Sequence, residues 1–314
     1  GRVTLPAYRP MLAVPADAPF SRGGWRFEPK WDGIRAMVAW DGAAVRLAGR
    51  RGGDITARYP ELAGLAAGAP LIIDGEIVTL GPDGRPSFER LQHRMHRDAP
   101  AAAAAAYPVA FVAFDLLFLD EPLIARPFEE RRRPLAGRGL GEPVVVSESV
   151  PGDGLALWEA VVERDLEGMV AKRADAPYQP GLRSPDWRKI ANLSFAKAVV
   201  GGFTPGEGGR RGTFGALVLG QWDGDRLRFV GSVGTGFSDR DLGAIREALD
   251  ASAITDTPFH DDPGLPGATW VEPALVASIG YRDWTSAGRL RHPRFRGFTG
   301  DPVEGITLSA EGPR

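Results

Sequence analysis

The sequence contains no cysteine and only four histidines in 314 residues. Without cysteine, disulfide frameworks, thiolate metal sites and cysteine nucleophiles are excluded, and a reducing interior is the compartment that fits. The histidines do not follow the spacing of a zinc site. His93 and His96, three residues apart, come nearest to one, and two polar positions on a helix explain them more simply. These absences argue against zinc and thiol chemistry.

The chain also lacks an excess of charge, an apolar leader and a long hydrophobic run. Lys and Arg number 38 and Asp and Glu 40, a net charge of −2, so any attraction to nucleic acid must come from local patches. Residues 1–6, Gly-Arg-Val-Thr-Leu-Pro, do not form a signal-peptide core, and no apolar run reaches the length of a membrane span. We therefore expect a cytoplasmic protein with no membrane partner.

The length and the strand patterns predict two domains. A chain of 314 residues with 43% hydrophobic and 25% charged residues can form two hydrophobic cores. Strand patterns alternate with helix patterns up to about residue 194. Beyond it the strands are short and punctuated by glycine, with one helix between them, which suggests a small β-barrel. We place the domains at residues 1–194 and 195–314.

Hydrophobic periodicity locates the elements expected in each domain. In the first domain, strands are expected at residues 24–28, 36–40, 43–47, 71–80, 109–119, 144–146 and 168–172. Helices are expected at 59–67, 87–97, 128–135 and 154–164, a short helix or a loop at 101–106, and a loop at 178–189. In the second domain, a helix is expected at 239–249 and strands at 198–203, 216–221, 226–233, 270–276, 278–284 and 305–308. The charged residues 129–133 fit a solvated helix face.

The most informative stretch is Glu-Pro-Lys-Trp-Asp-Gly-Ile-Arg at residues 28–35. Asp32-Gly33 predicts a tight turn between two strands, so Lys30 would stand at a strand end near Glu28, Asp32 and Arg35. Cationic neighbours and partial burial lower the pKa of a lysine, and such a lysine can act as a nucleophile. A surface hairpin with a solvated Lys and Arg explains this motif equally well when it is taken alone.

Two further stretches combine acidic residues with strand patterns. Asp-Gly-Glu at 74–76 interrupts an apolar strand, where carboxylates need partners in order to be buried. An ordinary Asp-Gly hairpin turn is the alternative. Glu167 leads into a strand that ends at Lys172, so an acid and a base emerge from opposite ends of a few extended residues.

Six segments together resemble a known superfamily. They are, in order, EPKWDGIR at residues 28–35, GRRGG at 49–53, DGEIV at 74–78, FDLLFLD at 114–120, EGMVAK at 167–172 and SPDWRK at 184–189. In this order and spacing they resemble the covalent nucleotidyltransferases, and among these the bacterial ATP-dependent DNA ligases are most similar. The resemblance implies an α+β fold: a nucleotidyltransferase (adenylation) domain of packed antiparallel sheets and helices, followed by a small OB-fold β-barrel.

The resemblance also implies a reaction, the sealing of 3′-hydroxyl/5′-phosphate nicks in duplex DNA during DNA repair. Lys30 would attack the α-phosphate of ATP and form lysyl-AMP. AMP would then pass to the 5′-phosphate of the nick, and the 3′-hydroxyl would displace it. Phosphoryl transfer gathers negative charge, so Mg²⁺ or Mn²⁺ and a ring of Lys and Arg are implied. The implied partners are nicked DNA in the nucleoid and repair proteins such as a gap-filling polymerase, and the implied state is a monomer.

Roles at the nucleotide follow from the same resemblance. Glu28 would hold the adenine end and Phe114 would stack on the base. Glu76 would serve the ribose or the metal, and Glu167 the metal. Lys172 and Lys189 would contact the α-phosphate. The residues implied to bind the nucleotide are Glu28, Lys30, Arg35, Arg50, Glu76, Phe114, Lys172 and Lys189.

Contacts with DNA are implied for residues of both domains. Arg35 and Arg50 would receive the 5′-phosphate of the nick, while Asp32 would orient the 3′-hydroxyl; Asp115 and Trp187 are more simply structural. Basic residues interleaved with aromatic ones suit contact with phosphate and sugar, and a solvated surface is the alternative. Such residues cluster in the second domain at Arg282, Arg289, Arg291, Arg294 and Arg296, of which the last four are our DNA-binding candidates.

Two departures from the family pattern keep other functions open. Ala191 stands where the family usually has a second lysine, and Thr299 and Pro302 stand where its terminal motif has an arginine and a lysine around the position of Asp301. These cations help the first step in the family, so fast self-charging is in doubt. The alternatives are an RNA ligase, a capping-type guanylyltransferase, or a ligase-derived module that binds breaks with little turnover.

Overall fold

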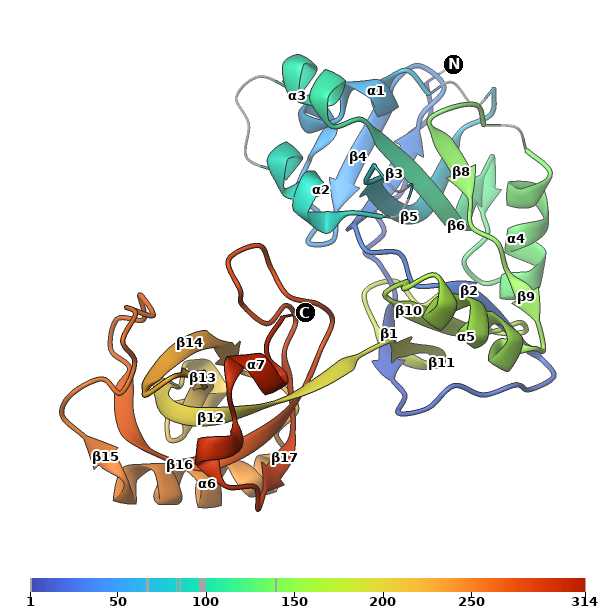
Figure 1. The fold of residues 1–314 in the computed structure, drawn as a ribbon. Coiled ribbons are helices and arrows are strands. Elements are labelled where there is room, and N and C mark those ends of the chain that lie inside the picture. Colours follow the sequence, from blue (N-terminus) through green and yellow to red (C-terminus); the bar gives the residue numbers. More distant parts are fainter. Residues whose placement is uncertain are drawn as a thin grey trace. The chain divides into compact units, whose positions relative to one another are not determined.

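The computed structural model describes residues 2–65, 68–82, 84, 86–95, 100–138 and 140–313. The chain divides into two compact units, unit 1 (Gly1–Asn192) and unit 2 (Leu193–Arg314) (Figure 1). Within the described ranges, no helix has the length and apolar character needed to cross a bilayer. The expected cytoplasmic location stays a prediction.

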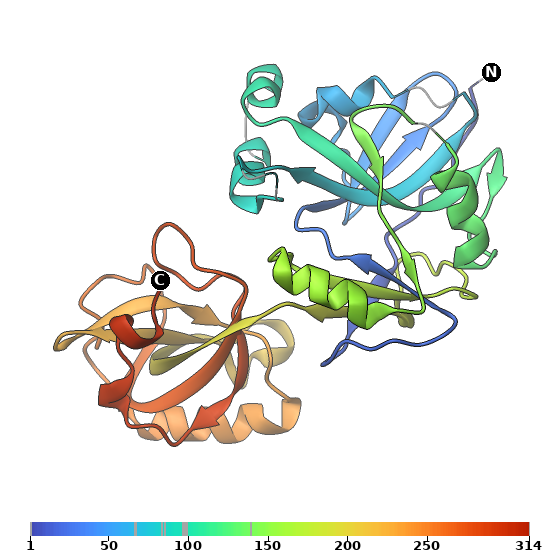
Figure 2. The same cartoon turned by 45° about the vertical axis from the view of Figure 1, so that its right-hand side comes forward.

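The first sheet of unit 1 has five strands in the order β1-β11-β10-β2-β9. They are β1 (Leu12–Pro15), β2 (Trp25–Pro29), β9 (Val150–Pro151), β10 (Gly168–Arg173) and β11 (Arg183–Ala191). Neighbours run antiparallel, except that β1 pairs in parallel with β11. Helix α5 (Gly154–Glu163) covers one face of this sheet (Figure 2), where Val161 is buried with Phe27 and Met169.

The second sheet of unit 1 has the order β4-β3-β5-β6-β7, with β8 in parallel beside β6. Its strands are β3 (Ile34–Trp40), β4 (Val45–Gly49), β5 (Leu71–Thr79), β6 (Val109–Leu119), β7 (Glu121–Pro122) and β8 (Val144–Val146). The helices that accompany it are α1 (Pro60–Ala63), α2 (Phe88–Met95), α3 (Pro100–Ala106) and α4 (Phe128–Ala136). Leu62 of α1 and Leu91 of α2 are buried with Phe111 of β6, so this sheet and its helices share one hydrophobic core.

Each helix expected in unit 1 has a counterpart, but the one expected at 59–67 is much shorter than expected, since α1 ends at Ala63 and residues 64–65 are not helical. Residues 101–106, for which a short helix or a loop was expected, form a helix, α3. Residues 66–67 and 96–97, which belong to two of the expected helices, lie outside the described residues. The charged face expected at 129–133 is wrong in part, because Arg131 is fully buried and Arg132 is nearly so.

The segment around Lys30 crosses from one sheet to the other. β2 belongs to the first sheet and β3 to the second, so the hairpin expected here is wrong. Lys30 N donates a hydrogen bond to Gly168 O, which holds the start of the crossing on β10. A Cβ atom on Gly33 would lie 2.2 Å from Ile77 O of β5, so glycine is required there by the close approach of two backbones. Apolar side chains such as Met11, Ile72 and Trp187 pack the two sheets together.

Two other sequence expectations about unit 1 need correction. Residues 74–76 form part of one continuous strand, β5, so the alternative of a hairpin turn at that place is wrong. The loop expected at 178–189 is also wrong over its second half, where β11 begins at Arg183. The pairing of β11 with β10 begins at Trp187, so Pro185 needs no hydrogen-bond partner there. This strand was not predicted because its sequence contains a proline and several charged residues.

Unit 2 is a six-stranded curved sheet with the order β14-β13-β12-β16-β15 and β17 beside β16. Its elements are β12 (Ser194–Pro205), β13 (Phe214–Asp223), β14 (Arg226–Val233), α6 (Asp239–Ala251), β15 (Ala253–Ile254), β16 (Thr269–Tyr281), β17 (Arg294–Thr299) and α7 (Leu308–Glu311). Leu290 N donates to Val230 O and Phe295 N to Thr235 O, which brings β17 back toward β14. Leu242, Ile245 and Leu249 of α6 are buried in the core of this barrel.

Four features of unit 2 differ from those expected, the first being the two-residue strand β15 (Ala253–Ile254), which was not expected. The two strands expected at 270–276 and 278–284 are one long strand, β16. The strand expected at 305–308 is absent, since a 3₁₀ turn over Val303–Gly305 and α7 occupy that stretch. β17 was not expected; its sequence Arg-Phe-Arg-Gly-Phe-Thr begins with an alternation of polar and apolar residues, but Gly297 interrupts it where the pairing with β16 shifts register.

Candidate active site

A pocket lies between the two sheets of unit 1, beside the segment that crosses between them. The residues lining it that the sequence analysis selected are Glu28, Lys30, Arg35, Arg50, Glu76, Phe114, Lys172 and Lys189. The other residues lining it are Leu12, Ala13, Pro29, Trp31, Val170, Arg183 and Trp187. Residues drawn from six segments of the sequence therefore meet at one place.

Lys30 is held by an acid that precedes β10. Its Nζ lies 2.5 Å from Glu167 Oε1, and both side chains are partly buried. The other oxygen of Glu167, Oε2, is buried and has no hydrogen-bond partner among the residues that the structure describes. Gly168 has φ +152°, and a Cβ atom there would lie 2.1 Å from Ile190 O. Glycine is therefore needed directly after Glu167 to bring this carboxylate to Lys30.

Glu76, a carboxylate on β5, lines the pocket. Burial raises its pKa to about 8, because a carboxylate removed from water is less stable in its charged form. Arg35 and Lys30 oppose this rise, whereas the neighbouring Glu167 and Asp74 add to it. Glu76 and Glu167 therefore act on each other as like charges.

The two carboxylates fit a divalent cation. Mg²⁺ prefers oxygen ligands and often takes one or two carboxylates together with substrate phosphates and water. Among the described residues the buried Oε2 of Glu167 has no hydrogen-bond partner and offers such a ligand, and a cation beside Glu76 would favour the charged form of that carboxylate. The described part of the chain holds no group of three or more His, Cys, Asp or Glu that could ligate a metal. Phosphate and water oxygens would therefore have to complete the coordination.

Arg35 is fixed in a buried network. Its Nε and Nη2 each lie 2.6 Å from an oxygen of Asp74, and Nη2 also donates to Met11 O. Tyr178 donates its hydroxyl to Asp74 Oδ2 at 2.5 Å. Burial disfavours the charged guanidinium, but Asp74 outweighs this and raises the pKa of Arg35. Asp74 thus has the partner that a carboxylate inside an apolar strand requires.

Aromatic rings line the inner end of the pocket. The guanidinium of Arg35 lies 4.7 Å from the ring centre of Phe114 and 5.5 Å from that of Trp187. Lys172 Nζ lies 4.3 Å from the Phe114 ring and 4.4 Å from the Trp187 ring. These cations stack on the π faces of both rings. A nucleotide base that stacks on the Phe114 ring would therefore lie next to Arg35 and Lys172.

Glu28 and Lys172 form a buried ion pair with a distance of 2.8 Å between Oε2 and Nζ. Burial lowers the pKa of Lys172, although Glu28 and Asp115 act in the opposite direction. Arg132 of α4 contacts the other oxygen of Glu28 at 3.5 Å and donates to Ser147 O. Arg132 was expected on a solvated helix face, and nothing local in the sequence indicates its contact with Glu28, which spans 104 residues of sequence.

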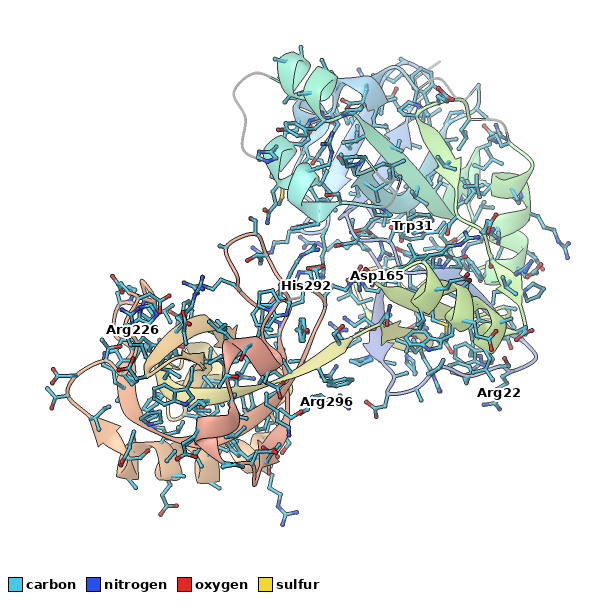
Figure 3. All side chains as sticks on the ribbon, viewed as in Figure 1. Arg22, Trp31, Asp165, Arg226, His292 and Arg296 are labelled. Carbon is cyan, nitrogen blue, oxygen red and sulfur yellow. The ribbon has the colours of Figure 1, made fainter. Side chains whose placement is uncertain are left out.

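Trp31 joins the crossing segment to the same network. Figure 3 marks it in unit 1, and its Nε1 donates to Ser147 Oγ at 3.0 Å. Ser147 is buried and follows β8. Asp32, the next residue, is half-buried and is not among the residues that line the pocket.

The outer part of the pocket is cationic. Burial lowers the pKa of Lys189, and the charges of Lys30, Arg183 and Arg50 lower it further. Arg50 follows β4 in a turn that contains Gly52 at φ +85°, a conformation that favours glycine. In the part of the chain that the structure describes, neither Arg50, Arg183 nor Lys189 forms an ion pair with a carboxylate. This cationic rim, formed by Arg50, Arg183 and Lys189, is therefore suited to binding an anion.

Asp115 has the structural role that the sequence analysis favoured. Its two oxygens accept hydrogen bonds from Arg131 Nε and Nη2, both at 2.8 Å, and both side chains are fully buried. Trp187 is also buried, but it lines the pocket as well.

The arginines selected in unit 2 differ in their surroundings. Arg289 pairs with Asp261 and donates to Phe229 O, and Arg291 pairs with Asp283. Arg294 and Arg296 lie on β17, where Arg296 is exposed (Figure 3). DNA contact stays a prediction for all four.

The histidine pair gives no support to a metal site. The ring of His93 stacks on Tyr107 with 4.7 Å between ring centres. His96 lies outside the described residues.

The sequence of each unit matches a family model. The model described as ATP dependent DNA ligase domain matches residues 10–191, and the one described as ATP dependent DNA ligase C terminal region matches residues 210–302. These matches confirm the predicted fold class, a nucleotidyltransferase domain followed by a smaller domain consistent with an OB-fold.

Individual relatives agree with the family models. The multifunctional non-homologous end joining DNA repair protein LigD of Mycobacterium tuberculosis is 40% identical over 93% of this chain and 38% of its own length. The corresponding protein of Mycolicibacterium smegmatis is 38% identical over 94% of this chain and 38% of its length. This chain therefore spans well under half of these curated relatives. A solved structure of mycobacterial DNA ligase D complexed with ATP and MES is 36% identical, with a TM-score of 0.57, and the match covers 96% of this chain and 98% of that one.

Proposed function

The chain belongs to the ATP-dependent DNA ligases, and on this premise we propose that it seals 3′-hydroxyl/5′-phosphate nicks in duplex DNA through a lysyl-AMP intermediate. The observation that carries the proposal is the position of Lys30. It lies in a pocket that gathers two carboxylates, an aromatic inner end and a cationic rim. Such a pocket suits a nucleoside triphosphate, whose base is flat and whose phosphates are anionic.

In the first step, Lys30 Nζ forms a bond to the α-phosphorus of ATP, and the bond from that phosphorus to pyrophosphate breaks. Lys30 must first lose a proton and leave Glu167, the carboxylate that holds it at 2.5 Å. Glu28 and Phe114, at the inner end of the pocket, would hold the adenine. Lys172 and Lys189 would balance the charge that develops on the α-phosphate.

Glu76 and Glu167 are the residues proposed to hold Mg²⁺ or Mn²⁺. When bound there, the cation supplies positive charge against the phosphates. Glu76 carries a proton below pH of about 8 when no cation is present, so binding of a cation displaces that proton.

In the second and third steps, the nick takes the place of pyrophosphate. An oxygen of the 5′-phosphate attacks the phosphorus of lysyl-AMP, and Lys30 leaves. The 3′-hydroxyl then attacks the 5′-phosphate, and AMP leaves with the electron pair. Arg50 and Arg35 would receive the 5′-phosphate, and Asp32 would orient the 3′-hydroxyl. Arg289, Arg291, Arg294 and Arg296 would contact the duplex.

The partners proposed for this activity follow from the relatives. Both mycobacterial relatives are named as multifunctional non-homologous end joining proteins, and we propose that this chain supplies the ligase activity in break repair of that kind. Residues 1–194 would act as the adenylation domain and residues 195–314 as the DNA-binding barrel, in a monomer. A gap-filling polymerase would prepare the nick.

The test uses each labelled nucleoside triphosphate with a nicked duplex and follows the label on protein and on nucleic acid. We expect label on protein from ATP alone and a sealed strand on addition of the nick. Label from GTP would support a guanylyltransferase, and sealing confined to RNA would support an RNA ligase. Binding to nicks without any label or sealing would overturn the proposal in favour of a break-binding module.

A further inference from the structure

Arg183 lines the active-site pocket and has no role in the reaction outlined above. It is the first residue of β11, opposite Leu12 of β1. Its Nη1 donates to Ala13 O at 2.6 Å, which ties one side of the guanidinium to the pocket wall. Over the described ranges, its other N–H groups have no partner and the residue is exposed.

Positive charges outnumber negative ones around Arg183: Lys30, Arg50 and Lys189 lie near it, and Glu167, the carboxylate that also acts on Lys189, is paired with Lys30. Arg183 lies close enough to Lys189 to lower the pKa of that lysine, and its effect exceeds that of Arg50. Like charges repel, and no carboxylate pairs with Arg50, Arg183 or Lys189 in the described part of the chain. Such a cluster becomes stable when an anion occupies it.

The guanidinium group is suited to one kind of anion. Its remaining N–H groups form a planar fork, which matches two oxygens of a phosphate. The hydrogen bond to Ala13 O fixes the fork in advance, so less side-chain entropy is lost when a ligand arrives.

We propose that Arg183 is a phosphate-binding residue of the ligase reaction, in contact with a phosphate other than the one that Lys30 attacks. The inference rests on the proposed function. Two sources supply such a phosphate: the pyrophosphate part of ATP in the first step, and the 5′-phosphate of the nick in the second. The chemistry of recognition is the same for both.

The test compares Arg183→Gln with a matched control on the same strand. Glutamine keeps a donor for Ala13 O but removes the positive charge. The control is Arg188→Ala: Arg188 is also on β11, but its guanidinium lies over Trp25 and it does not line this pocket. Thermal unfolding of both variants checks that the fold is kept.

Two assays distinguish the sources. The first measures single-turnover charging of AMP-free protein over a range of ATP concentrations. The second measures transfer of AMP by pre-charged protein to a nick with a 5′-phosphate, together with binding of that nick and of one with a 5′-hydroxyl. A charge-assisted contact to phosphate is worth about tenfold in either assay.

A loss of about tenfold in the apparent affinity for ATP assigns Arg183 to the pyrophosphate part. A similar loss in transfer, with a reduced preference for the 5′-phosphate nick, assigns it to the nick. Wild-type behaviour of Arg183→Gln in both assays overturns the inference, and so does an equal loss in Arg188→Ala. If Arg183→Gln unfolds, Arg183→Lys decides in the same assays, because lysine lacks the fork and should lose activity. Failure of the wild-type protein to charge would instead refute the proposed function.

Discussion

The buried pair of Asp115 and Arg131 allows a prediction whose size follows from the structure. Both side chains have no exposed surface, and two hydrogen bonds of 2.8 Å join them. Asp115→Leu leaves the Arg131 guanidinium buried without its counter-ion. Loss of one partner of such a pair costs about 3–5 kcal/mol. For a unit of this size, about 6–20 °C would be lost from the Tm.

The double variant separates stability from chemistry. Asp115→Leu combined with Arg131→Met removes both charges, so much of the loss should be recovered. Recovery will be incomplete, because Arg131 also donates to Arg126 O and Ala176 O. Calorimetry of the two single variants and the double variant gives the coupling energy. Charging of Lys30 is then measured well below the lowest Tm.

Two results would contradict this prediction. A loss of less than about 1 kcal/mol in Asp115→Leu would show that the pair does not carry the expected stability. A double variant that is stable but cannot charge Lys30 would show that Asp115 takes part in chemistry, contrary to the structural role assigned to it.

Four further predictions concern the pocket. With ATP and Mg²⁺ or Mn²⁺, mass spectrometry should find one AMP on Lys30, and Lys30→Ala should abolish it; an adduct on another lysine contradicts the assignment. Glu167→Ala should impair charging and sealing alike. Arg50→Ala should spare charging and slow the transfer of AMP to the nick by about tenfold, measured with pre-charged protein. Loss of charging alone in Arg50→Ala would contradict the assignment of Arg50 to the phosphate of the nick. Ala191→Lys should raise the single-turnover charging rate, with an upper limit of about 10- to 150-fold, while the rate of sealing by pre-charged protein stays the same. No gain at equal stability would contradict the hypothesis that charging is slow because residue 191 is not a lysine. Lys189→Met should raise the Tm at neutral pH by about 2–4 °C, because it removes about 1 kcal/mol of unfavourable free energy that comes from the burial of the charge and from like-charge repulsion. The folded-state pKa of Lys189 is lowered, so the gain should shrink as pH rises toward 10.5; a gain independent of pH would point to packing instead.

The sequence was sufficient to select the residues that meet in the pocket. Lys30, Glu76 and Lys172 come from three motifs whose order was recognisable, and the structure brings them together. It was also sufficient to locate most strands, because alternating and apolar runs such as residues 109–119 have few other structural solutions.

The sequence did not determine which strands pair. Strand patterns flank Lys30 on both sides, and a hairpin was the simplest arrangement of them. Only the contacts of β2 with β10 and of β3 with β5 reveal that the chain changes sheets at this point. Arg132 and Arg183 were missed for a related reason. Each acts through a partner more than 100 residues away, and neither residue carries a local signal of its role.

The parallel pairing of β1 with β11 has a consequence for folding kinetics. It joins residues 171 to 174 positions apart, such as Leu12 with Arg183 and Pro15 with Lys189, and it supplies Leu12, Ala13, Arg183 and Lys189 to the pocket wall. Contacts between such distant residues close a long loop and form slowly. We therefore expect the pocket to be completed late in the folding of unit 1, after local hairpins such as β3–β4. The appearance of AMP-charging activity during refolding would then report the last event of folding, and it should lag behind the recovery of secondary structure.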